Sequence, residues 1–133
     1  MLDEARLARV AAAHGVQLVV QFGSTVTGRT HPDSDVDLAV LLDDAAPGFE
    51  RHGELASDLQ ACFPDHPVDL AVLNHADPLF LKQIFDTARL IYGPVRRFQE
   101  LRILAFKRYQ DHRRYLALER EVVARRLGAG LSS

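Results

Sequence analysis

Short apolar runs alternate along the chain with longer segments in which apolar residues recur every three or four positions. Short apolar runs between turn formers are typical of buried strands, and the longer recurrence is typical of helices that bury one face. The runs predict strands at residues 16–22, 35–42, 68–73 and 90–92, the last at a sheet edge. The recurrence predicts helices at residues 2–14, 49–62, 78–87 and about 95–127.

Turn formers and capping residues mark the element boundaries. Gly15 ends the first helix, and Asp77 followed by Pro78 is a favoured N-cap and first helical residue. Between the first two strands, Gly23 and Ser24 open a short helix or turn, and a loop follows it. The element order predicts an α/β fold in which helices flank a small mixed β-sheet, with a long C-terminal helix.

The composition narrows the class of protein. With 133 residues, 47% of them hydrophobic and 26% charged, residues 1–133 can form one domain with its own core. Cys62 is the only cysteine, which excludes disulfides and cysteine zinc sites, and its helical position predicts a small core residue. No apolar run is as long as a membrane span, and no signal peptide is recognisable, so we expect a cytoplasmic protein that does not use a membrane.

The charge is unevenly distributed. Residues 1–95 carry 6 basic and 14 acidic side chains, a net of −8, whereas residues 96–133 carry 10 basic and 4 acidic, a net of +6. One interpretation is a basic tail that meets an acidic partner, and the other is a solvated helix whose arginines face water. The tail also has an apolar stripe, formed by Phe98, Leu101, Ala105, Tyr109, His112 and Leu116. We therefore expect this helix to pack on its own domain and to offer a basic face to a partner protein, and we do not expect it to bind nucleic acid directly.

The candidate chemistry lies in the segment GSTVTGRTHPDSDVDLAVLL, residues 23–42. Asp35 and Asp37 flank Val36, and side chains two apart on a strand point to the same face. Two carboxylates so placed repel each other unless a hard cation such as Mg²⁺ binds between them. Asp69 occupies the matching place in VDLAVL, so a third carboxylate joins them if the two strands are neighbours. Three carboxylates that hold two Mg²⁺ ions are suited to phosphoryl transfer.

Gly23 and Ser24 supply the complementary feature. They stand where a strand ends and a helix begins, and backbone N–H groups at such a place bind phosphate. Gly23 allows the backbone to approach the phosphate closely, and the Ser24 hydroxyl adds a hydrogen bond. Phosphates on one side and metals on the other predict a nucleoside triphosphate site.

The Gly-Ser pair, the spacer, Asp-x-Asp and a third aspartate on a later strand resemble the nucleotidyltransferase superfamily that includes DNA polymerase β. The short length and the two matching strands are similar to the minimal nucleotidyltransferases, which are found as antitoxins of HEPN/MNT toxin–antitoxin pairs. The resemblance implies a polymerase β-like fold and the Mg²⁺-dependent transfer of AMP from ATP to a hydroxyl, a tyrosine, of a HEPN ribonuclease toxin. It covers residues 15–75 closely.

The resemblance also implies a role for each site residue. Gly23 and Ser24 would hold the triphosphate, Asp35 and Asp37 would bind both magnesium ions, and Asp69 would bind the catalytic metal and help deprotonate the attacking hydroxyl. Many minimal members have arginine directly after Gly-Ser, where this chain has Thr25. Arg29 is the nearest arginine, and it either contacts the phosphates or faces solvent.

Two alternatives stay open at this point. One is a nucleotidyltransferase with a small-molecule acceptor, and the other is a non-catalytic antitoxin that neutralises its toxin by contact. Each motif alone is weak, because Asp-x-Asp also occurs in glycosyltransferases and at ordinary strand ends. The sequence also leaves the choice between a homo-oligomer and a hetero-oligomer open.

Overall fold

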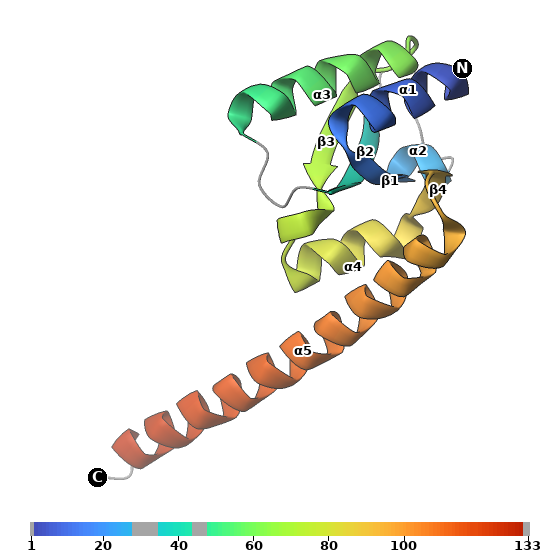
Figure 1. The fold of residues 1–133 in the computed structure, drawn as a ribbon. Coiled ribbons are helices and arrows are strands. Elements are labelled where there is room, and N and C mark those ends of the chain that lie inside the picture. Colours follow the sequence, from blue (N-terminus) through green and yellow to red (C-terminus); the bar gives the residue numbers. More distant parts are fainter. Residues whose placement is uncertain (1, 28–34, 44–47, 132–133) are drawn as a thin grey trace.

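The computed structural model describes residues 2–27, 35–43 and 48–131 of the chain. It contains four strands and five α-helices in the order shown in Figure 1. The strands are β1 (Val16–Phe22), β2 (Val36–Leu42), β3 (Val68–Val72) and β4 (Arg89–Tyr92). The helices are α1 (Glu4–His14), α2 (Ser24–Thr27), α3 (Phe49–Cys62), α4 (Pro78–Thr87) and α5 (Val95–Leu131), and a short 3₁₀ turn, η1, covers Leu73–His75.

The strands form one mixed sheet in the order β3-β2-β1-β4. β1 runs antiparallel to both β2 and β4, while β2 and β3 are parallel. The predicted mixed sheet is confirmed, and β4 lies at its edge as expected. The parallel β2–β3 pair is joined through α3, which is the long crossover that such a pair requires.

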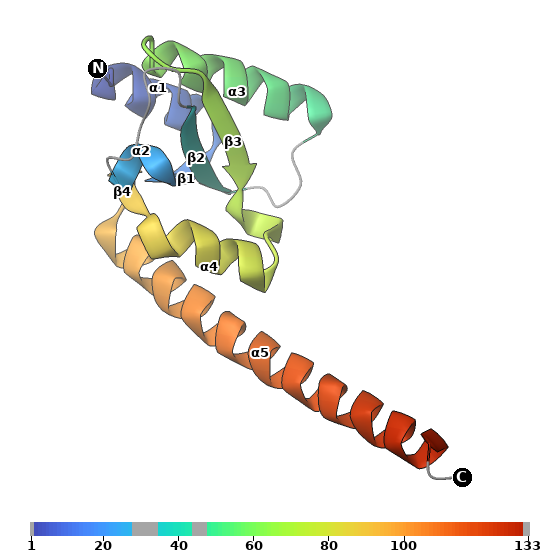
Figure 2. The same cartoon turned by 180° about the vertical axis from the view of Figure 1, so that it is seen from behind.

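Helices cover both faces of the sheet, as the two views in Figures 1 and 2 agree. On one face, Leu7 of α1 and Leu59 of α3 pack against Val19 and Val40, and all four are nearly or fully buried. On the other face, side chains of α4 and the first part of α5 pack against the alternate residues of the strands. Apolar positions on both faces explain the continuous apolar centre of β1 and β2. Cys62 is fully buried in the first cluster, as predicted.

The helix boundaries follow the capping rules read from the sequence. The Asp77 side chain accepts a hydrogen bond of 2.9 Å from the Phe80 N–H at the start of α4, and Pro78 is the first helical residue. Asp3 caps α1 in the same way, by accepting from the Arg6 N–H at 3.1 Å. Gly15 ends α1 in the left-handed conformation, with a φ of 65°.

The last helix differs from its prediction. Phe98, Leu101 and Ala105 are buried on the sheet side, but Leu116 is 37% exposed. The expectation that the whole stripe packs on the domain is therefore wrong beyond about the first third of α5. The reason is geometric: α5 has 37 residues and spans about 55 Å, whereas α4, against which it packs, has 10 residues and spans about 15 Å. The rest of α5 extends away from the sheet (Figures 1 and 2).

Across the described ranges, no helix combines the length and the apolar character needed to cross a membrane.

Candidate active site

Two of the three candidate carboxylates lie side by side on neighbouring strands. In the parallel register of β2 and β3, Asp37 pairs with Asp69. Adjacent strands lie about 4.8 Å apart, so the two carboxylates share one end and one face of the sheet. On the other side of Asp37, the antiparallel register pairs it with Phe22, the last residue of β1. Gly23 and Ser24 therefore begin beside Asp37, and the topology brings two motifs together that the sequence separates.

Asp35 stands just outside the sheet. β2 begins at Val36 rather than at residue 35, so the predicted strand is one residue too long at this end. Asp35 and Asp69 are exposed, while Asp37 between them is half-buried. The pKa of the Asp37 carboxyl is raised above its usual range, first by burial and then by the negative charges of Asp69 and Asp35. The three carboxylates thus interact electrostatically, with Asp37 at the centre.

The Asp37 carboxylate also leaves no room for a side chain at Gly23. Its φ of 80° lies in the left-handed region, which side chains other than glycine rarely adopt. A β-carbon added to Gly23 would collide with Oδ2 of Asp37. The backbone N–H of Gly23 donates a 2.9 Å hydrogen bond to Oγ1 of Thr87, at the end of α4. The sequence explained Gly23 by the approach of a phosphate, and the structure adds a second reason, the close approach of Asp37.

The Gly-Ser turn continues into α2, a helix of only four residues. The Ser24 side chain is exposed at its start, and the Thr27 hydroxyl donates a 3.2 Å hydrogen bond to the Ser24 carbonyl. At Thr25, where the family pattern has arginine, the hydroxyl accepts a 2.9 Å hydrogen bond from Nε2 of Gln21. Arg29, the candidate phosphate contact, lies outside the described residues.

A glutamine on α3 fixes the start of β3. Oε1 of Gln60 accepts a 2.7 Å hydrogen bond from the N–H of Val68, the residue before Asp69. Its Nε2 donates to the carbonyls of Phe63 and His66, at 3.1 and 2.7 Å. One side chain thus satisfies three backbone groups of the turn that leads into β3. Gln60 and Thr87 position the site, and no sequence motif pointed to either of them.

The three carboxylates offer the chemistry that Mg²⁺ prefers, although they do not converge fully. Within residues 2–27, 35–43 and 48–131, no three acidic, histidine or cysteine side chains meet closely enough to bind a metal ion together. All donors are carboxylate oxygens, the ligands that hard divalent cations select. The pKa of Asp37 is raised by burial first and then by repulsion from Asp69 and Asp35, and a bound cation would relieve that repulsion. The residues therefore fit the predicted metal in charge and donor type.

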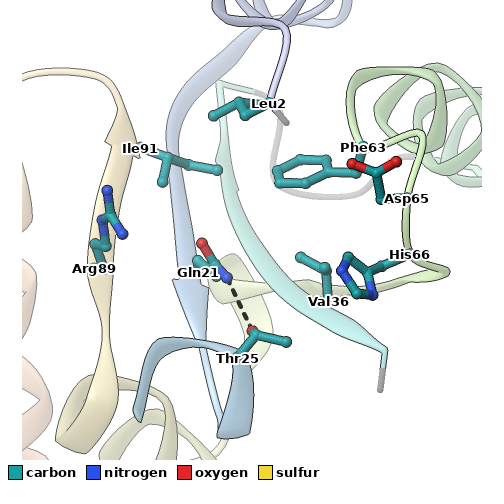
Figure 3. Close-up of a pocket in the computed structure, with 9 residues that line it drawn as sticks. All are labelled: Leu2, Gln21, Thr25, Val36, Phe63, Asp65, His66, Arg89 and Ile91. Atoms are coloured by element: carbon teal, nitrogen blue, oxygen red, sulfur yellow. Dashed lines mark hydrogen bonds between the residues drawn. The ribbon is translucent and has the colours of Figure 1, made fainter. Parts of the chain in front are cut away.

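A pocket of about 360 Å³ lies on the face of the sheet that α1 and α3 cover, opposite the face on which Asp37 and Asp69 lie. Figure 3 shows Arg89 and His66 on opposite sides of it, and the Gln21–Thr25 hydrogen bond at its base. The candidate carboxylates do not line this pocket, because residues 37 and 69 alternate with those that face it. The pocket is therefore separate from the carboxylate cluster.

Known proteins share the sequence pattern and the fold of this chain. Residues 6–96 match the family model described as "Polymerase beta, Nucleotidyltransferase". The chain is 30% identical over 108 residues to the protein adenylyltransferase MntA of Shewanella oneidensis MR-1, an alignment that covers 81% of this chain and 73% of that protein.

Solved structures share the fold. A chain of a toxin–antitoxin crystallised with AMP-PNP is 26% identical and superposes with a TM-score of 0.72, covering 95% of this chain and 98% of that chain. A chain from the complex of tri-AMPylated Shewanella oneidensis HEPN toxin with MNT antitoxin is 23% identical, with a TM-score of 0.65, covering 93% of this chain and 94% of that one. Most of the long terminal helix, which has 37 residues, is therefore included in both superpositions.

Proposed function

The chain belongs to the polymerase beta nucleotidyltransferase family, and on that premise we propose that it transfers AMP from ATP to a hydroxyl of a HEPN ribonuclease toxin. One relative, MntA, is a protein adenylyltransferase, which supports a protein as the acceptor. The toxin–antitoxin relative with AMP-PNP supports ATP as the donor. We expect the protein to act in the cytoplasm, where ATP is available. Residues 1–133 would form one nucleotidyltransferase domain.

The pairing of Asp37 with Asp69 beside the Gly-Ser turn is the observation that carries this proposal. It joins the carboxylates and the candidate phosphate-binding turn at one end of the sheet. A structural role alone does not explain this arrangement, because burial and then the adjacent carboxylates raise the pKa of Asp37 and cost stability. Such a cost is expected where charge is held ready for a cationic ligand.

Each residue of the site would have its own role in the reaction. The Ser24 hydroxyl and the backbone N–H groups after Gly23 would hold the triphosphate. Asp35, Asp37 and Asp69 would hold magnesium ions, which neutralise the charge that develops on the phosphates during transfer. Asp69, exposed at the edge strand, would accept the proton of the attacking hydroxyl. The oxygen forms its bond to the α-phosphorus as pyrophosphate leaves, and AMP stays on the acceptor.

The exposure of Asp35 and Asp69 is compatible with a protein acceptor, because a side chain of another protein can reach them. A tyrosine of the toxin is the expected acceptor, by the resemblance to minimal nucleotidyltransferases. A small-molecule acceptor is less well supported, since MntA modifies protein. A non-catalytic antitoxin would have no need to keep three interacting carboxylates.

A growth assay separates catalysis from simple contact. The chain is co-expressed with the product of the adjacent gene, which we expect to be a HEPN protein, and growth is compared with that of cells that carry Asp35→Ala or the exposed control Asp58→Ala. We expect the wild type and Asp58→Ala to restore growth, and Asp35→Ala to fail although it still co-purifies with the HEPN protein. Full restoration of growth by Asp35→Ala would show that contact alone neutralises the toxin.

A further inference from the structure

The apolar stripe of α5 continues past the part of the helix that packs on the sheet. Leu116, Val123 and Leu127 follow Phe98 and Ala105 at helical spacings, so they lie on the same face. They are 37%, 48% and 63% exposed, whereas Phe98 and Ala105 are buried. These three residues, which we call the distal stripe, line a shallow apolar groove together with Glu119, Arg120 and Ala124.

Contacts between α4 and α5 stop well before the distal stripe. The ammonium of Lys82 on α4 lies 4.9 Å from the ring centre of Tyr109, seven residues before Leu116. Beyond this point α5 extends alone in both views (Figures 1 and 2). Most of the stability of a helix in a protein comes from the packing of its apolar face, which this part of α5 lacks within the described residues. The Arg125–Glu121 ion pair of 2.6 Å is exposed and adds little. The distal stripe therefore has the properties of a surface that another molecule covers.

The charges on this face argue against a second copy of the chain. Arg113 and Arg120 alternate with the distal stripe, at positions 113, 116, 120, 123 and 127 along one helix face. Both arginines are exposed, and Arg120 forms no ion pair within the described ranges. If two distal stripes packed together, each copy would bring two arginines and one carboxylate, Glu119, into the interface, which would keep an unfavourable excess of positive charge. Carboxylates from a different protein would instead neutralise them.

We propose that the distal stripe docks an acidic amphipathic helix of the protein that accepts the nucleotide. Aliphatic residues of that helix would pack on Leu116, Val123 and Leu127, and its Asp or Glu residues would pair with Arg113 and Arg120. The net charge of −8 on residues 1–95 repels an acidic partner, while the +6 on residues 96–133 attracts it, so the charge distribution directs the partner to α5. The identity of the partner rests on the proposed function.

A binding measurement with matched variants tests the docking surface. The full chain is titrated by calorimetry against the product of the adjacent gene, which we expect to be a HEPN protein. Leu116→Glu/Val123→Glu/Leu127→Glu should weaken binding by about 100-fold or more, because three apolar contacts are replaced by charges that repel an acidic helix. The matched control is Tyr115→Glu/Leu118→Glu/Val122→Glu, which adds the same charge to another exposed face of α5. The control should bind within about threefold of wild type. Helix content by circular dichroism verifies the fold of both variants.

A second pair of variants tests the charge complementarity. Arg113→Glu/Arg120→Glu should weaken binding about tenfold at low salt and reduce its salt dependence. Lys107→Glu/Arg114→Glu makes the same change on the opposite face of α5, where both side chains are exposed. This second control should keep both the affinity and the salt dependence of the wild type.

Each other outcome overturns the docking proposal, the proposed function or both. Equal affinity of the distal-stripe variant and the wild type, or an equal loss in the control, would overturn it while leaving the proposed function intact. A wild-type chain that is dimeric alone by light scattering, and that the distal-stripe variant makes monomeric, would assign the stripe to a second copy. Binding that depends on the distal stripe, without AMP transfer by the wild type, would overturn the proposed function alone. No binding by the wild type would overturn both.

Discussion

Asp37 of β2 and Asp69 of β3 stand opposite each other in a parallel register, and the Asp37 carboxylate also lies against Gly23 at the end of β1. The fold therefore gathers negative charge at the point where the Gly-Ser turn begins. Burial and the neighbouring charges raise the pKa of Asp37, so the folded protein holds this carboxylate at a cost. We interpret that cost as the preparation of a site for magnesium-bound phosphates.

Asp37→Asn should make the metal-free protein more stable and the enzyme inactive. The neutral amide removes the repulsion from Asp69 and Asp35, so we expect the melting temperature without metal to rise by a few degrees. It also removes a candidate metal ligand, so AMP transfer should fall by roughly 10²-fold or more. Differential scanning fluorimetry with EDTA and with Mg²⁺ measures the stability. Mg²⁺ should stabilise the wild type more than Asp37→Asn, and an equal effect on both would count against the carboxylate site.

The stability of the metal-free protein should depend on pH through Asp37. Because its pKa is raised above 3.8 in the folded state, the folded protein binds more protons than the unfolded chain between 3.8 and the raised value. The free energy of unfolding therefore decreases as pH rises through that window. The stability difference between Asp37→Asn and the wild type should grow over the same window, as measured by denaturation in EDTA. AMP transfer should change in the opposite sense and fall as acid protonates Asp37. A difference that is flat with pH would rule out a raised Asp37 pKa.

Gly23→Ala should destabilise the protein by about 1–3 kcal/mol, because alanine is strained at a positive φ and its β-carbon meets the Asp37 carboxylate. The cost should be smaller when Asp37 is replaced by alanine, since one of the two causes is then removed. Urea denaturation of the two single variants and the double variant measures this coupling. Gly53→Ala is a suitable control, because a β-carbon there meets nothing within 4 Å. Additive effects at Gly23 and Asp37 would contradict the contact.

Gln60→Leu should weaken both the fold and the reaction. It leaves the Val68 N–H and two carbonyls of the turn before β3 without their partner, which should cost about 2–3 kcal/mol. Because Val68 precedes Asp69, the loss should lower kcat while the KM for ATP changes little. Gln99→Leu, at an exposed position of α5, serves as the control and should change neither stability nor kcat. An unchanged kcat in a folded Gln60→Leu protein would limit Gln60 to a purely structural role.

The strands, the helices and the mixed sheet could be read from the sequence, because each follows local rules of periodicity and capping. Asp77 with Pro78 and the left-handed Gly15 are examples. The pairing of Asp37 with Asp69 could be anticipated only conditionally, since the similar sequences of the two strands do not establish that they are neighbours. The structure supplies that condition through the register of β2 and β3.

Other features depend on contacts between distant residues, which no local pattern encodes. Gln60 and Thr87 are ordinary polar residues of helices in the sequence, and their roles follow from where β3 and the Gly-Ser turn lie in space. The packing of α5 was overestimated for the same reason. Its apolar stripe is continuous along the chain, but the length of α4 decides how much of it the protein itself can cover.

The most direct test of the central claim is the intact mass of the product of the adjacent gene, the expected HEPN protein, after incubation with the purified chain, Mg²⁺ and ATP. We predict that its mass increases by one or more AMP units, and that Asp35→Ala, Asp37→Ala and Asp69→Ala each abolish the increase, whereas Asp58→Ala does not. Fragmentation would then locate the modified hydroxyl. An unchanged mass with all four nucleoside triphosphates, from a chain that still forms a stable complex with the HEPN protein, would contradict the proposed nucleotide transfer.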